Sequence, residues 1–111
     1  MTEHPIDHLF AIISARKSAS ARKSYTSKLL KAGVAQCAKK LGEEGVEAAL
    51  AAVGGRKKEI IAESADVLYH LLVLWAATGV KPQTVYAALE KRRSRSGLAE
   101  KKPASGNDIQ S

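Results

Sequence analysis

The sequence has too few cysteines for the disulfides or thiolate-bound metal ions that stabilise many small proteins. Its 111 residues include a single cysteine, Cys37, so an intrachain disulfide and a zinc site made of several thiolates are both excluded. A domain of this size buries too little surface to leave a large margin of stability. We therefore expect one domain in a reducing cytoplasm, with further surface buried in an oligomer.

Long hydrophobic runs and a secretion signal are also missing. The longest apolar run, residues 67–77, is interrupted by Tyr69 and His70 and is shorter than the roughly 20 residues that a membrane span needs. Residues 1–10 carry acids and a proline instead of a basic start followed by an apolar stretch. The sequence therefore predicts a soluble protein with no membrane partner.

Acidic residues are absent from a long segment of this chain. Residues 9–42 contain eight Lys or Arg and no Asp or Glu, whereas six of the eleven carboxylates lie between Glu43 and Asp66. The net charge of +7 and a second basic segment near the end suit a polyanion, but the acidic centre does not. A basic helical protein that binds nucleic acid is thus the alternative of another class, and we expect no nucleic-acid partner.

The spacing of apolar residues predicts an all-α protein with four helices. No strand-like alternation of useful length and no Gly-rich phosphate loop of the Walker type is present in the sequence. The predicted helices share apolar steps of three and four and lie at residues 5–17, 27–53, 57–78 and from Pro82 onward. The third is apolar around most of its circumference over its second half, which indicates cover by another subunit. We expect a helical domain over residues 1–93 and a basic, flexible tail over residues 94–111.

Two pairs of carboxylates fall on the flanks of neighbouring predicted helices. At about 100° per residue, Glu44 and Glu47 lie about 60° apart beside the apolar face, and Glu63 and Asp66 share one stripe of the next helix. A short Gly-Gly link would fold these two helices antiparallel and bring the stripes together. Partly desolvated carboxylates repel one another unless a cation lies between them. Oxygen-only ligands favour Mg²⁺, with Mn²⁺ as the alternative.

These acids also have an ordinary structural interpretation. Glutamates on helices are usually solvated, and Lys40 precedes Glu44 by four residues, as in a surface ion pair. His70 continues the stripe of Glu63 and Asp66, but a packed, hydrogen-bonded histidine is the commoner case. Both pairs of acids on facing flanks make the metal site the favoured interpretation.

Three aromatic residues leave two interpretations open. Tyr25, Tyr69 and Trp75 could stack on a nucleotide base or could pack in the core or an interface. Because Tyr69 and Trp75 lie on the apolar third helix, packing is favoured for the set.

The acidic segments resemble a known pair of motifs. Lys40-Leu-Gly-Glu43-Glu44-Gly-Val-Glu47 and Glu63-Ser-Ala-Asp66 resemble the EExxE and ExxD motifs of the all-α NTP pyrophosphohydrolases, the MazG-like superfamily. Three further segments, at residues 24–29, 66–70 and 96–101, narrow the resemblance to the phosphoribosyl-ATP pyrophosphatases. The resemblance covers roughly residues 6–105.

The resemblance implies a four-helix, MazG-like bundle completed by oligomerisation into at least a homodimer. It implies hydrolysis of phosphoribosyl-ATP to phosphoribosyl-AMP and pyrophosphate in histidine biosynthesis. The implied metal ligands are Glu44, Glu47, Glu63 and Asp66. The implied catalytic residues are Glu43, Glu44 and Glu47, with Glu43 as a base or as a neighbour of the ligands.

Basic residues are expected to bind the phosphates of the substrate. The candidates are Lys28, Lys40, Arg92, Arg93, Arg95 and Lys101. For the arginines, a solvated surface is an equally good interpretation. A hydrolase of noncanonical or excess nucleoside triphosphates, with the same fold and metal, is the alternative function that the acidic motifs alone leave open.

Overall fold

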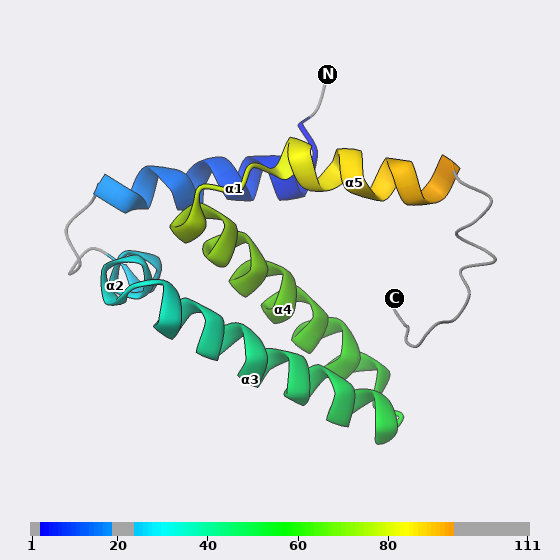
Figure 1. Cartoon of the computed structure of the whole chain (residues 1–111). Helices are drawn as coiled ribbons and strands as arrows, with labels where there is room; N and C mark the ends of the chain where they lie inside the picture. Colours follow the sequence, from blue (N-terminus) through cyan, green and yellow to red (C-terminus); the bar gives the residue numbers. More distant parts are fainter. Residues whose placement is uncertain (1–2, 19–23, 95–111) are drawn as a thin grey trace. The chain divides into compact units, whose positions relative to one another are not determined.

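The computed structural model of the chain describes residues 3–18 and 24–94, which form helices and their connections without a strand (Figure 1). The elements are α1 (Pro5–Ala15), the short 3-10 helix η1 (Arg16–Ser18), α2 (Tyr25–Ala32), α3 (Val34–Val53), α4 (Lys57–Thr78) and α5 (Pro82–Ser94). The all-α prediction is confirmed for these residues.

The chain divides into two compact units. Residues 1–80 hold α1 to α4, and residues 81–111 hold α5. The basic run Lys91, Arg92 and Arg93 forms the last turn of α5. The tail predicted for residues 94–111 lies outside the described residues, apart from Ser94 at the end of α5.

The predicted single helix over residues 27–53 is wrong, because the chain breaks at Gly33. Gly33 has φ 103° and ψ 172°, a backbone region that is essentially reserved for glycine. The break separates α2 from α3, and Ser24 then caps the new helix by accepting a hydrogen bond from the Ser27 amide at 3.0 Å. Figure 1 shows that α2 leaves the axis of α3. It therefore also packs against α4, where Thr26 and Tyr69 are hydrogen-bonded through their hydroxyls.

We expect Gly33→Ala to lower the free energy of unfolding by about 1–3 kcal/mol. A methyl group at Gly33 would meet no atom within 4 Å, so the cost comes from the backbone conformation alone. Gly42→Ala is the matched control, because Gly42 lies within α3 with equally open space around it. That change should instead raise stability by about 0.5–1 kcal/mol. Urea unfolding of both variants would measure the difference, and equal effects would contradict it.

The core of the first unit lies where α1, α2 and the start of α3 meet the second half of α4. Its buried side chains are Ile13, Leu29, Cys37, Leu72, Val73 and Ala76. The Cys37 thiol donates a hydrogen bond to the Leu29 carbonyl at 3.3 Å, which ties α3 to α2 within this core. Phe10 and Trp75 pack against the cluster with their ring centroids 6.5 Å apart.

Helix α4 is the central helix of this unit, since it contacts α1, α2 and α3. By length and composition alone it could cross a membrane, a test that core helices of soluble proteins also pass. The uninterrupted apolar run at residues 67–77 is therefore shorter than the apolar part of this helix. The first half of α4 nevertheless carries Glu59, Glu63 and Asp66, of which Glu63 and Asp66 belong to the site described next.

Candidate metal centre

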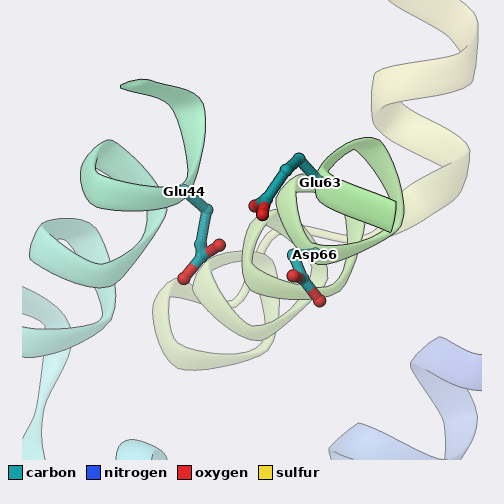
Figure 2. A group of neighbouring side chains, drawn as sticks. All are labelled: Glu44, Glu63 and Asp66. Carbon is teal, nitrogen blue, oxygen red and sulfur yellow. The ribbon is translucent and has the colours of Figure 1, made fainter. Parts of the chain in front are cut away.

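The antiparallel pair α3 and α4 brings acids from both helices to one place. The two helices run side by side and are joined by only three residues, 54–56 (Figure 1). Figure 2 shows Glu44 on α3 facing Glu63 and Asp66 on α4. One carboxylate oxygen from each of the three residues lies within 4.8 Å of the others. The predicted meeting of the two acidic stripes therefore holds for these three side chains.

Glu63 is the least satisfied member of this carboxylate cluster. Its Oε1 atom is buried and has no hydrogen-bond partner among the described residues. Partial burial raises the pKa of Glu63, and the negative charges of Glu47, Asp66 and Glu44 raise it further. A buried, unpartnered carboxylate oxygen beside other carboxylates is costly unless a cation is bound. The donor atoms are all hard oxygens, so the residues present fit a hard divalent cation.

The two other acids of the first motif occupy different positions. Glu47 is exposed one turn after Glu44, outside the three-residue cluster, but close enough for its charge to act on Glu63. Glu43 is also exposed and forms an ion pair with Lys40, with Nζ and Oε1 3.2 Å apart. The ion pair suggested by the sequence thus involves Glu43, and Glu44 is left to the cluster.

The predicted phosphate-binding residues are spread over several parts of the chain. Lys40 lies beside the carboxylates, and its pKa is raised by the hydrogen bond to Glu43 and by the negative charges of Glu43 and Glu44. Lys28 is exposed on α2. Arg92 and Arg93 are exposed on α5, where Arg93 pairs with Glu90 through Nη2 and Oε2 at 2.8 Å. That helix belongs to the second unit, and Arg95 and Lys101 fall outside the part of the chain that the structure describes.

His70 is packed among aromatic rings. It is 5% exposed, and its ring meets Tyr69 and Tyr25 edge-on at centroid distances of 4.9 and 6.1 Å. The expected hydrogen bond is not seen for Nδ1, which is buried without a partner among residues 3–18 and 24–94. Burial lowers the pKa of His70, so the ring is held in its neutral form near neutral pH.

Without a metal ion, the contribution of Glu63 to stability should fall as the pH rises above 4.5, the ordinary pKa of its carboxyl. A carboxyl whose pKa is raised by folding stabilises the fold while protonated, and this contribution is lost as the pH passes its folded pKa. Urea unfolding in EDTA from pH 4.5 to neutrality would measure the loss. In Glu63→Gln the decline should be smaller, and equal slopes for the two proteins would contradict the interpretation.

Comparison with known proteins gives one consistent result. The sequence pattern of the phosphoribosyl-ATP pyrophosphohydrolase family matches residues 6–93. A phosphoribosyl-ATP pyrophosphatase of Parvibaculum lavamentivorans is 57% identical over 96 residues, which cover 86% of this chain and 88% of that protein. The enzyme of the same name from Methylobacterium nodulans is 52% identical over 101 residues, covering 91% and 94%.

A third relative agrees with these two. The phosphoribosyl-ATP pyrophosphatase of Azospirillum brasilense is 49% identical over 96 residues, which cover 86% of each chain. The matched region includes every residue of the carboxylate cluster. The chain therefore belongs to the phosphoribosyl-ATP pyrophosphohydrolase family.

Proposed function

We propose that this protein hydrolyses phosphoribosyl-ATP to phosphoribosyl-AMP and pyrophosphate, a step of histidine biosynthesis in the cytoplasm. The observation that carries the proposal is the meeting of Glu44, Glu63 and Asp66 across two helices in a member of this family. Three carboxylates in one small volume are unfavourable for the fold alone, which supports a functional reason for their placement.

The ion that we propose for this site is Mg²⁺, with Mn²⁺ as a substitute. Glu44, Glu63 and Asp66 would hold it, and Glu47 would complete the set by a change of its exposed side chain. The bound ion would supply positive charge against the phosphates and make a nearby water more acidic. No protein nucleophile is needed for this reaction.

Glu43 is the base that we propose. It lies next to Glu44 but outside the cluster, and it is exposed, so its carboxylate is free to accept a proton from the attacking water. Its ion pair with Lys40 orients the carboxylate. Attack of this water on phosphorus would then release pyrophosphate.

Cationic side chains would bind the phosphate groups of the substrate. We propose Lys40 as the first of these, because it lies beside the cluster and pairs with Glu43. The remaining candidates are Lys28, Arg92, Arg93, Arg95 and Lys101. We further propose that catalysis belongs to a domain of residues 1–93 and that residues 94–111 form a tail that contributes contacts to the substrate.

Exposed apolar side chains support a homodimer that completes the bundle. Several large apolar side chains on α3 and α4 are exposed. On α3 three of them are spaced by four and three residues, at Val46, Leu50 and Val53. On α4 two of them are seven residues apart, at Ile61 and Leu68. Such spacing places each set on one face of its helix.

Sedimentation equilibrium of Leu50→Lys should show weaker self-association than the unchanged protein, because a charge would be buried in the interface.

Pyrophosphate release from phosphoribosyl-ATP would test the proposed function. We expect turnover with Mg²⁺, none with EDTA, and restoration when Mg²⁺ is added back. Deoxynucleoside triphosphates should be included as competing substrates in the same assay. Selective turnover of these would keep the site but replace the substrate, and no turnover of either would contradict a hydrolytic function.

A further inference from the structure

A second layer of side chains lies beside the carboxylate cluster. The helices α3 and α4 are antiparallel. A step of four residues back from Glu44 on α3 and a step of four residues forward from Asp66 on α4 therefore move in the same direction along the helix pair. These positions are Lys40 and His70. Each lies one turn, about 5.4 Å of helix rise, beyond the cluster. The direction leads toward the core and toward α2.

Tyr25, the first residue of α2, covers this second layer. Its ring meets the ring of His70 edge-on at 6.1 Å. Tyr25 therefore contacts this layer on the α4 side. The ring nevertheless stays 51% exposed.

The structure distinguishes the exposed ring of Tyr25 from the two other aromatic residues that the sequence grouped with it. The hydroxyl of Tyr69 is hydrogen-bonded to Thr26, and Trp75 packs against Phe10 beside the core. Tyr69 also lies nearly parallel to Tyr25, with an interplanar angle of 23° and a centroid distance of 6.4 Å. The packing interpretation thus suits Tyr69 and Trp75, whereas Tyr25 presents a supported ring to solvent.

We propose that Tyr25 stacks on the adenine ring of phosphoribosyl-ATP and so fixes the direction of the substrate in the site. The phosphates would lie at the carboxylate cluster, Lys40 would follow, and the base would reach α2. This inference rests on the proposed function. In phosphoribosyl-ATP the second ribose occupies an edge of the adenine, whereas both faces stay open. Stacking on an aromatic ring uses a face and needs no free edge.

The surroundings of Tyr25 keep its ring in place before the substrate arrives. His70 is buried and neutral, and the Ser24 cap fixes the first turn of α2. A ring that is already ordered loses little rotational freedom on stacking, which favours binding. Tyr25 is accordingly a binding residue for the base, whereas His70 positions it.

Two substitutions of the full chain separate stacking from mere packing. Tyr25→Phe keeps the aromatic face, and Tyr25→Leu keeps apolar volume without that face. Calorimetry with Mg²⁺ should measure the binding of phosphoribosyl-AMP and, separately, of pyrophosphate. We expect Tyr25→Leu to weaken phosphoribosyl-AMP by about 5- to 150-fold, the range of base stacking on an aromatic side chain. Tyr25→Phe should stay near the unchanged protein, and pyrophosphate should bind all three proteins equally.

Three results would overturn the stacking. The first is equal binding of phosphoribosyl-AMP by all proteins, and the second is equal weakening of phosphoribosyl-AMP and pyrophosphate by Tyr25→Leu. The third is a different oligomeric state of Tyr25→Leu in analytical ultracentrifugation, which would show that the ring lies in an interface between subunits. Turnover of phosphoribosyl-ATP by the unchanged protein is measured in the same preparation. Its absence would overturn the proposed function, whereas normal turnover with unchanged product binding would overturn only the role of Tyr25.

Discussion

Glu63→Gln and Glu44→Gln should each lower the metal-dependent kcat for phosphoribosyl-ATP by at least about 100-fold. Loss of groups that only support metal ligands already costs about 10- to 100-fold, and these two carboxylates would bind the ion directly. Glutamine keeps the size of the side chain but removes the charge. Pyrophosphate release at saturating substrate and graded Mg²⁺ would measure the effect.

Glu59→Gln is the matched control for these variants. Glu59 lies on α4 one turn before Glu63, is exposed, and pairs with Arg56. An exposed pair contributes little to stability, so both activity and folding should stay near those of the unchanged protein. Activity that falls equally in Glu59→Gln and Glu63→Gln would contradict a specific role for the carboxylate cluster.

The melting temperatures of Glu63→Gln and Glu59→Gln, measured with Mg²⁺ and with EDTA, test the metal site independently of turnover. Mg²⁺ that binds only the folded protein must raise its melting temperature, and the increase continues with the logarithm of the free Mg²⁺ concentration after the site is filled. The increase should be present in Glu59→Gln and absent in Glu63→Gln. In EDTA, Glu63→Gln should melt above the unchanged protein, because it removes one of the charges that repel one another in the carboxylate cluster. A lower melting temperature in EDTA would show that Glu63 has a structural partner.

Ile13→Ala should lower the free energy of unfolding by about 2–5 kcal/mol. Ile13 is 1% exposed in the core, whereas its neighbour Ile12 is 41% exposed on the same helix. Ile12→Ala removes the same atoms and serves as the control. We expect it to cost less than about 0.5 kcal/mol, as for most surface changes. Urea unfolding of both variants at equal protein concentration would measure the difference.

Ile13 belongs to the core through which α1 packs against α4. If Ile12→Ala proved as costly as Ile13→Ala, α1 would have to be rotated about its axis relative to the structure. A large cost for Ile13→Ala alone would confirm which face of α1 is buried. The carboxylate cluster lies away from α1, so the kcat of the folded variants should change little.

Helix α4 shows how far the sequence could predict the fold. Its bounds, residues 57–78, agree with the prediction, because the Gly-Gly link precedes it and Gly79 ends it in a left-handed conformation with φ 81°. Such ends are local properties of the chain. The apolar positions within α4 predicted that it is covered around much of its circumference, although they could not tell which of them face α1, α2 or α3.

Gly33 shows where sequence reasoning failed. Apolar steps continue across it from Leu30 to Val34, so the pattern alone favours one helix over residues 27–53. A glycine within such a pattern is usually tolerated, and only the packing of α2 on α4 shows that the chain turns here. The same turn brings Tyr25 beside His70, which explains why the sequence could group aromatic residues but not select Tyr25.

For the site, spacing along each helix predicted which acids share a stripe, and the short link predicted that the stripes meet. Glu44, Glu63 and Asp66 follow that prediction in the structure. The positions of Glu43 and Glu47 depend on rotamers and on Lys40, so helical periodicity could not separate them from Glu44. The roles of these five residues stay predictions until the variants are measured.

The short connection between α3 and α4 has a consequence for the order of folding. Glu44 and Asp66 are separated by little chain, and the two helices that carry them need only a three-residue turn to meet. Closing such a short loop costs little entropy, so contacts of this kind form early on the folding pathway. We expect the transition state for folding to contain this helix pair, with the repelling carboxylates already close together. Divalent cations should accordingly speed refolding of the chain, and not only slow its unfolding.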